Sequence, residues 1–467
     1  MNRNVLAGLA AAAVLVAGCT MAPSYERPDA PIPVAWPRGP AYEQAPAEGP
    51  AGAELGWREF FADPRLQQVL EMALEGNRDL RAAALNVELA RARYGIQRAE
   101  LLPALQATAG GGKQRASADL TQPGQPRTTE RYEANLGVLS WEIDFFGRIR
   151  SLKDAALEEY LATEEARRSA QVLLVSAVAS TYLALAADAE ALALARSTYE
   201  TQTAAYDLVR RQYEVGVATE LDLHRAQTPV DVARREVAVD TQRVAEDRNA
   251  LHLLVGGPVP AALLPEALST VGPLRDVSPG TSSEVLLRRP DVRQAEGLLK
   301  AAHADMGAAL AAFFPRISLT GAVGTASDEL CRLFKNGTGT WSYAPQIVLP
   351  IFDARTWSAH EGAKVQREIA LNRYEQAIQS AFREVADALA VRGTVDQQVA
   401  AQQSLVAALA ETHRLARLRF ERGIDSYLSV LDAQRSLFAA QQVLIALRLA
   451  RLLSQVRLYT VAGGGWQ

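Results

Sequence analysis

The side chains that most often perform catalysis or hold metals are few and scattered in this chain. The 467-residue sequence contains two cysteines, Cys19 and Cys331, and five histidines, at positions 224, 252, 303, 360 and 413. Two cysteines cannot build a disulfide framework or a zinc site made of paired cysteines. His360 and Glu361 lack the second histidine, four residues on, that a zinc-protease helix requires. We therefore expect no metal site.

Complete motifs for phosphate binding and nucleophilic catalysis are also missing from the sequence. The run Gly110–Lys113 is similar to part of a phosphate loop, but Gln114 stands where a serine or threonine has to meet magnesium. No nucleophile elbow, dinucleotide-binding glycine loop or EF-hand loop is found in the sequence. We expect no cofactor apart from a lipid anchor, and no enzymatic activity.

The charge balance argues against a nucleic-acid partner. The chain carries 49 lysines and arginines against 53 aspartates and glutamates, a formal net charge of −4. Proteins that bind DNA or RNA usually present a basic face or stripe to the phosphates. With 49 % hydrophobic residues, the chain is long and apolar enough to bury a large core, so it is not a disordered protein.

The amino terminus is typical of a secreted lipoprotein. Residues 1–18 contain an uncharged run over 5–17, shorter than the ~20 residues that span a bilayer, as in a signal peptide. The run ends in Leu-Val-Ala-Gly-Cys at 15–19, which resembles a bacterial lipobox and implies that Cys19 carries the lipid anchor. Thr20 then implies sorting to the outer membrane. The alternative is an ordinary signal peptide with a chance cysteine.

The lipidated segment after the signal, residues 19–60, is expected to be extended. Prolines recur between positions 21 and 50, and proline disfavours helix. We expect this segment to follow the surface of the folded body. A disordered linker is the alternative.

The rest of the chain is an internal repeat. Asp79-Leu80-Arg81 recurs as Asp291-Val292-Arg293, and Gly216 recurs as Gly423, 207 positions later (423 − 216). A unit of about 200 residues is therefore present twice, over 61–257 and 283–467, joined by a proline-rich loop over 258–282.

Each repeat has the same predicted order of elements. A helical stretch (63–101 and 283–313) precedes a stretch rich in Gly, Thr and Ser (103–146 and 315–352), where apolar and polar residues alternate as in a β-hairpin. A very long helix follows each hairpin. Residues 148–215 contain no Gly or Pro, which predicts a helix of ~100 Å. A return helix (219–255 and 426–461) completes each repeat.

Four amphipathic strands cannot form a membrane barrel alone. Open sheet edges in lipid leave backbone groups unsatisfied, and single-chain barrels need eight or more strands. Either the hairpins are soluble, or several chains contribute strands to one barrel.

Five segments of the sequence carry a family resemblance. Trp57–Pro64, Leu287–Glu296, Trp141–Arg148, Tyr427–Arg435 and Leu458–Trp466 resemble the outer-membrane factors of tripartite export systems, and most of all the lipoprotein branch that serves RND-type drug efflux pumps. The resemblance implies an α+β membrane protein. Three chains would form a twelve-stranded β-barrel in the outer membrane that continues into a periplasmic α-helical barrel. It also implies a passive duct whose partners are a periplasmic adaptor and an inner-membrane RND-type pump.

The resemblance also implies a gate where the helix tips turn at Gly216 and Gly423. Asp432 matches the constricting aspartate of the family, Leu428 an apolar plug position, and Asp222 a residue that locks the tips by hydrogen bonding. A ring of carboxylates at such an aperture attracts cations. The alternative for Asp432 is a solvated charge on a helix face.

Two positions depart from the family pattern. Some relatives carry a second aspartate where this chain has Ser429, and a basic residue where it has Asp425. We therefore expect a single Asp432 ring with a layer of Leu428 side chains. Two other functions remain open on the sequence alone, namely a type I protein secretion duct and a periplasmic structural lipoprotein whose hairpins never enter lipid.

Overall fold

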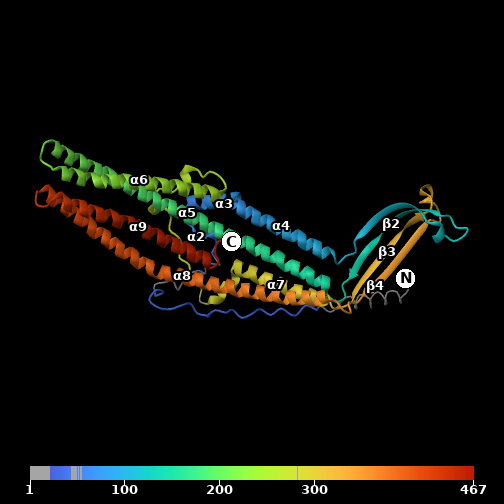
Figure 1. Ribbon diagram of the computed structural model, residues 1–467. Helices are drawn as coiled ribbons and strands as arrows, with labels where there is room; N and C mark the ends of the chain where they lie inside the picture. Colours follow the sequence, from blue (N-terminus) through green and yellow to red (C-terminus); the bar gives the residue numbers. More distant parts are fainter. Residues whose placement is uncertain (1–20, 44–49, 51, 53–54, 281, 467) are drawn as a thin grey trace. The chain divides into compact units, whose positions relative to one another are not determined.

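The computed structural model describes residues 21–43, 50, 52, 55–280 and 282–466 (Figure 1). The predicted signal peptide and Cys19 lie outside the described residues. The first repeat contains helices α2 (Trp57–Phe60), α3 (Pro64–Gly76), α4 (Arg78–Ala99), α5 (Arg148–Glu214) and α6 (Glu220–Val255), with strands β1 (Leu105–Arg115) and β2 (Thr128–Ile143). The second contains α7 (Pro290–Ala311), β3 (Arg316–Ser327), β4 (Gly339–Val348), α8 (Ala354–Glu421) and α9 (Tyr427–Val461).

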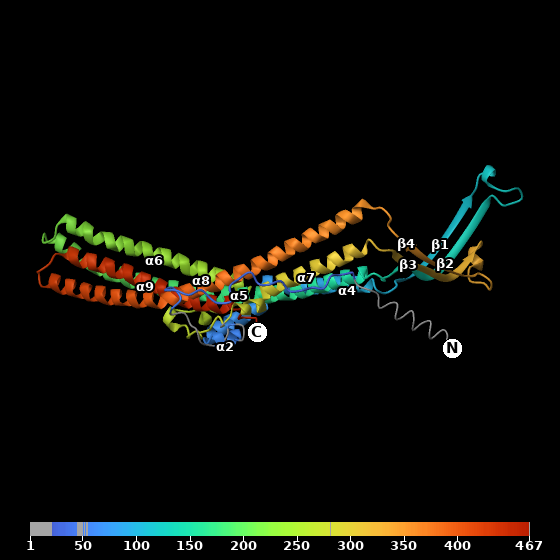
Figure 2. The ribbon, with the colours of Figure 1, turned by 90° about the horizontal axis from the view of Figure 1, so that it is seen from below.

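The four strands form one antiparallel sheet in the order β1-β2-β3-β4 (Figure 2). Each repeat supplies one hairpin, and β2 pairs with β3 to join the two hairpins. The prediction of four strands per chain is confirmed. Strands β1 and β4 each have one edge without a partner strand in the described part of the chain.

The register gives the sheet one apolar and one polar face. Directly paired residues of antiparallel strands share a face, and neighbours along a strand alternate between faces. The pairs Leu105↔Val138, Val138↔Gly321 and Gly321↔Tyr343 therefore place the following side chains together on one face: Leu105, Ala107, Leu136, Val138, Trp141, Ile143, Ile317, Leu319, Val323, Trp341, Tyr343 and Ile347. The ion pair between Lys113 and Glu130 is on this face, toward the β1–β2 turn.

Polar and small residues occupy the opposite face, among them Thr108, Asn135, Glu142, Arg316, Ser318, Ser342 and Gln346. A β-bulge between Val138 and Trp141 adds one residue to β2 where it faces β3. Thr320 donates a hydrogen bond from its hydroxyl to the Leu139 carbonyl there, at 2.7 Å.

Two very long helices follow the hairpins, as predicted. Helix α5 has 67 residues and α8 has 68. Helix α5 contains no Gly or Pro, whereas α8 continues through Gly362 and Gly393. The two helices end just before Gly216 and Gly423. Both glycines adopt positive φ, +79° and +70°. Glycine adopts this left-handed conformation without steric cost, which is why it terminates helices.

The predicted helical stretches at the start of each repeat are interrupted. Asn77 separates α3 from α4 with extended backbone, while its side chain donates to the Leu254 carbonyl and accepts from the Leu80 amide. Arg289 ends a short 3₁₀ turn (Ser283–Arg288) before α7 in the same way. At the first break the Asn77 side chain satisfies a backbone amide that the break leaves free, and at the second the Arg289 side chain donates to the Val461 carbonyl at 2.9 Å.

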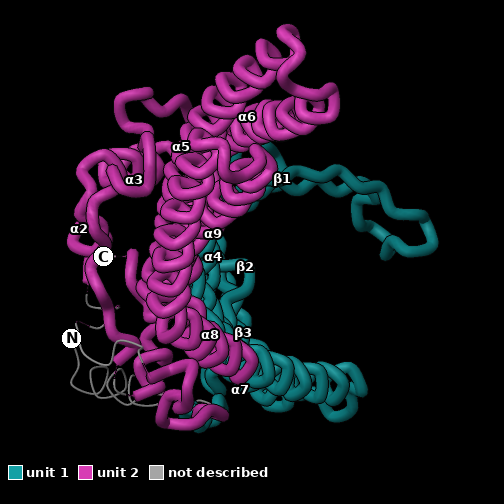
Figure 3. The backbone as a smooth tube through the Cα atoms, turned by 90° about the vertical axis from the view of Figure 1, so that its left-hand side faces the viewer, with its two compact units in different colours: residues 1–29, 86–163, 294–374 teal, residues 30–85, 164–293, 375–467 magenta. Residues whose placement is uncertain are grey.

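The chain divides into two compact units, each containing parts of both repeats (Figure 3). Residues 1–29, 86–163 and 294–374 form the first unit, which holds the sheet. Residues 30–85, 164–293 and 375–467 form the second unit, which holds the turns at Gly216 and Gly423. The core of the second unit includes an aromatic cluster in which Phe60 stacks on Tyr459 with centroids 4.0 Å apart.

Residues 21–43 contain no helix or strand, and specific side chains hold them in each unit. In the first unit Arg27 donates two hydrogen bonds, at 2.9 and 2.8 Å, to the carboxylate of Glu296, whose side chain is 7 % exposed. In the second unit the Trp36 indole donates to the Gly280 carbonyl and stacks on Phe382.

Candidate functional site at the helix tips

Both helix tips use the same backbone turn. At the first tip the amides of Gly216 and Val217 donate to the carbonyls of Tyr213 and Gln212, at 3.0 and 2.8 Å. At the second, Gly423 and Ile424 donate to Phe420 and Arg419, both at 2.9 Å. This paired pattern is the Schellman motif, which satisfies the last carbonyls of a helix. The structure thus places the two predicted tip glycines at equivalent turns.

The side chains around the two turns differ. At the first tip Thr219 and Asp222 form a capping box at the start of α6. The Asp222 carboxylate accepts from the Thr219 hydroxyl at 2.6 Å and from its amide at 3.1 Å, and the Asp222 amide donates to the Thr219 hydroxyl oxygen. These hydrogen bonds from Thr219 lower the pKa of Asp222, which stays ionised.

At the second tip the equivalent positions are Ser426 and Ser429, and Ser426 makes no side-chain cap. An ion pair crosses the turn instead, because Arg419 donates to both carboxylate oxygens of Asp425, at 2.5 and 3.0 Å. The hydrogen bonds from Arg419 lower the pKa of Asp425. Phe420 packs on Tyr427 with ring centroids 5.1 Å apart.

Asp425 departs from the family pattern, and its ion pair with Arg419 is not among the features predicted from the sequence. The signal available in the sequence was a pair of opposite charges, Arg419 and Asp425, flanking a helix-ending glycine. The Schellman turn reverses the chain between them and brings the two side chains together.

Leu428 and Asp432 lie together in one groove of about 370 Å³ between helices α5, α6 and α9. The groove is lined from the first repeat by Gln202, Arg225, Pro229 and Val232, among others, and from the second by Leu431 and Phe438. Asp222 is not among its lining residues. The structure therefore brings two of the three predicted gate residues together and leaves Asp222 in the first turn.

Asp432 has a cationic partner that the sequence reasoning did not assign. Arg435, one helical turn along α9, donates to its carboxylate at 2.5 Å. Both side chains remain open to solvent, 64 % exposed for Asp432 and 81 % for Arg435, and Leu428 is 53 % exposed. The carboxylate and the apolar side chain are thus both accessible on the surface of a single chain.

The described residues contain no group of three or more His, Cys, Asp or Glu side chains arranged to hold a metal ion. Cys331 is an exposed free thiol in the β3–β4 connection, with its sulfur 3.6 Å from a Glu329 carboxylate oxygen. Acidic and basic groups at the tips are arranged in ion pairs and caps, so the chemistry available there is electrostatic.

Comparison with known proteins decides the family. The family model described as "Outer membrane efflux protein" matches residues 69–257 and 281–464. The chain belongs to this outer membrane efflux protein family. It is 47 % identical over its whole length, and 96 % of the relative, to the probable efflux pump outer membrane protein TtgC of Pseudomonas putida. It is 41 % identical to the outer membrane protein OprJ of Pseudomonas aeruginosa, covering 97 % of this chain and 94 % of OprJ.

Solved structures agree with this family assignment. The open state of the Neisseria gonorrhoeae MtrE outer membrane channel superposes with a TM-score of 0.87 at 37 % identity, covering 96 % of this chain and 99 % of that one. A membrane protein of Pseudomonas aeruginosa gives a TM-score of 0.89 at 40 % identity, covering 96 % and 98 % of the two chains.

The predicted family, fold class, location and function are therefore confirmed. This outer membrane efflux protein is an outer-membrane channel component of an efflux pump. The match argues against a purely structural periplasmic lipoprotein, because the relatives are named as efflux components and channels.

Proposed function

We propose that three copies of this chain form a passive exit duct that is closed at the tips of α5/α6 and α8/α9. The sheet carries this proposal. Its apolar face is exposed in the single chain, with Trp341 79 % exposed and Tyr343 and Ile347 each 68 % exposed, and its outer strands have open edges. Membrane barrels need an apolar outer face and no free edge. Pairing β1 of one chain with β4 of the next meets both needs.

Helix α9 supports the same assembly. It contains an 18-residue stretch that is apolar and long enough to cross a membrane, yet only 17 % of that stretch is buried within the chain. The corresponding stretch of α5 is 56 % buried. Apolar helix surface of this size needs cover, and neighbouring helices of other copies would provide it in a helical barrel.

In the proposed pump, an inner-membrane RND-type transporter supplies the energy and a periplasmic adaptor links it to the duct. The relatives support the partner class, since they are named as outer membrane proteins of efflux pumps for toluene, other solvents and antibiotics. Drugs or other small molecules would be the cargo here. The duct itself would catalyse no reaction. The lipid on Cys19 would add a second attachment to the outer membrane.

We assign the gate to Asp432 and Leu428, with Asp222 holding the first tip. A carboxylate and an apolar side chain accessible in one groove support a charged ring and an apolar layer once three copies converge. The charge would favour cations, and the leucine layer would resist wetting.

The test is single-channel conductance of the detergent-purified protein in planar bilayers. Wild type should give a small, cation-preferring conductance, and Asp432→Ala or Leu428→Ala should raise it at least twofold. Asp231→Ala is the matched control, because Asp231 forms an ion pair of the same spacing with Arg234 on α6 outside the groove. Channels indifferent to both gate variants would move the gate elsewhere, and a folded oligomer without conductance would refute the duct.

A further inference from the structure

A second charged cluster lies at the foot of the sheet, where β2 and β3 meet the helices. Arg148, at the start of α5, donates to both carboxylate oxygens of Glu142 at 2.8 Å. The Nε of Arg316, at the start of β3, lies 3.2 Å from the same carboxylate. Two guanidinium groups therefore share one carboxylate. They lie beside a cavity of about 490 Å³ lined by β2, β3 and β4 and by the connections and helix ends that adjoin them.

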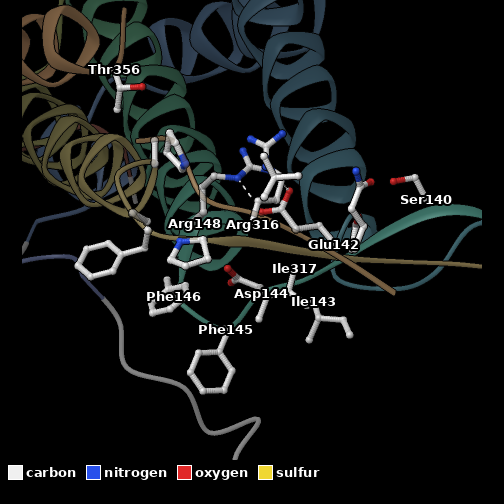
Figure 4. A pocket seen from close by; sticks show the side chains of 18 residues that line it. Ser140, Glu142, Ile143, Asp144, Phe145, Phe146, Arg148, Arg316, Ile317 and Thr356 are labelled. Atoms are coloured by element: carbon white, nitrogen blue, oxygen red, sulfur yellow. Dashed lines mark hydrogen bonds and ion pairs between the residues drawn. The ribbon is translucent and has the colours of Figure 1, made fainter. Parts of the chain in front are cut away.

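The register places this cluster on the polar face. Glu142 pairs with Ser318 and Ser318 with Gln346, so their side chains share a face, and Arg316 lies two residues from Ser318 on the same strand. Figure 4 shows Glu142, Arg148 and Arg316 gathered on one side of the strands, and Ile143, Ile317, Phe145 and Phe146 on the other. In a membrane barrel the polar face lines the lumen.

The cluster leaves one positive charge poorly balanced. Arg148 is 25 % exposed and is held by both its bonds to Glu142, with weaker attraction from Glu100 and Asp144. Asp144 is itself paired with Arg150. Arg316 is 58 % exposed, and among the described residues its only ion-pair partner is Glu142, which it shares. A solute on the polar face therefore meets the Arg316 guanidinium before the other groups.

We propose that Arg316 is a selectivity residue of the duct, which attracts the anionic groups of passing solutes, such as carboxylates and sulfonates, at the foot of the barrel. Glu142 and Arg148 act as positioning residues, because the bidentate pair holds the carboxylate against which Arg316 lies. This inference rests on the proposed function, since it needs the polar face to line a lumen.

The test compares two thiol reagents of opposite charge at a cysteine beside Arg316. Ser318→Cys, in a Cys331→Ser background, puts a thiol on the polar face, and the anionic ethylsulfonate and cationic ethyltrimethylammonium methanethiosulfonates report the local potential. Arg316→Gln should lower the anionic-to-cationic rate ratio about five- to tenfold at low salt. Arg316→Lys should retain most of the ratio.

The matched control is Lys113→Gln, which removes the same charge from the apolar face of the same sheet. It should change the ratio less than twofold. A ratio unchanged by Arg316→Gln, or lowered equally by Lys113→Gln, would overturn the assignment of Arg316.

A second cysteine position distinguishes a wrong assignment of Arg316 from a wrong proposal of the barrel itself. Leu319→Cys places the thiol on the apolar face, where lipid should protect it from both reagents. Modification of Leu319→Cys but not Ser318→Cys would invert the faces and refute the proposed barrel. Modification of neither would show that no aqueous lumen reaches Arg316, which also overturns its role.

Discussion

Among single residues, the ion pair between Asp432 and Arg435 decides how much charge the proposed gate presents. An exposed pair contributes little to stability, but its cation still offsets the field of the carboxylate beside it. Arg435→Ala should therefore raise the cation-to-anion permeability ratio two- to threefold, measured as the reversal potential in a salt gradient. Arg234→Ala, which frees Asp231 in the same way outside the groove, should leave the ratio unchanged. A ratio that falls in Arg435→Ala would contradict the Asp432 ring.

A second residue-scale prediction concerns two carboxyl groups between α5 and α6. Burial and the charge of the neighbouring Asp188 carboxyl group raise the pKa of Asp247 from 3.8 to about 6, with a smaller effect of Glu246. The folded state then binds the proton of Asp247 more tightly than the unfolded chain does, so the protonated carboxyl group stabilises the fold. This stabilisation is complete below about pH 4 and is lost as pH rises to about 6.

Asp247→Asn should therefore stabilise the protein at pH 7, by about 1 kcal/mol once solvent screening of this half-buried group is allowed for. The variant should also flatten the pH dependence of the thermal midpoint between pH 4 and 6. Circular dichroism melts of the purified protein measure both effects. Asp231→Asn is the control, since that carboxylate is exposed on the same helix and pairs with Arg234 instead. If Asp247→Asn were less stable than wild type at pH 7, the folded protein would tolerate the ionised pair of Asp188 and Asp247.

At the scale of elements, the two helix hairpins share a turn but not a cap. The Thr219 hydroxyl caps α6, whereas the equivalent Ser426 makes no side-chain cap on α9. Thr219→Ala should therefore speed hydrogen exchange of the amides at the start of α6 about fivefold, as expected for loss of a helix cap. Ser426→Ala should change exchange at the start of α9 less than twofold. Equal effects at both tips would mean that the capping box does not hold the first turn.

The elements also show which features were predictable from sequence. Alternation in 315–352, the absence of Gly and Pro from 148–215 and the glycines at 216 and 423 were enough to predict strands, long helices and turns, because each is a local property of the chain. The break at Asn77 was not predicted, since its side chain bonds to Leu254, far away in sequence. The bulge in β2 was missed because it depends on the register with β3.

The candidate gate likewise has features that were predictable from the sequence and features that were not. Its residues were assigned by motif resemblance, and the structure adds the partners that a motif does not contain, Arg435 for Asp432 and Arg419 for Asp425. Their pairing depends on a helical turn in one case and on a chain reversal in the other. Such partners follow from backbone geometry rather than from residue type.

For the whole molecule, the two faces of the sheet decide whether the chain assembles in a membrane. Tyr343 and Ser342 are neighbours near the middle of β4 on opposite faces. Arginine on the lipid face of a membrane barrel near mid-bilayer costs about 2–4 kcal/mol per chain, whereas lumen positions tolerate it. Tyr343→Arg should therefore abolish the detergent-resistant oligomer, and Ser342→Arg should preserve it.

Native mass spectrometry in detergent reads out this pair of variants directly. Wild type and Ser342→Arg should have the mass of a trimer, and Tyr343→Arg the mass of a monomer. A dimer of the wild type would mean eight strands rather than twelve, because each chain contributes four. Trimers of all three proteins would mean that the apolar face does not contact lipid, and the exposed Trp341, Tyr343 and Ile347 would then need a protein partner to cover them.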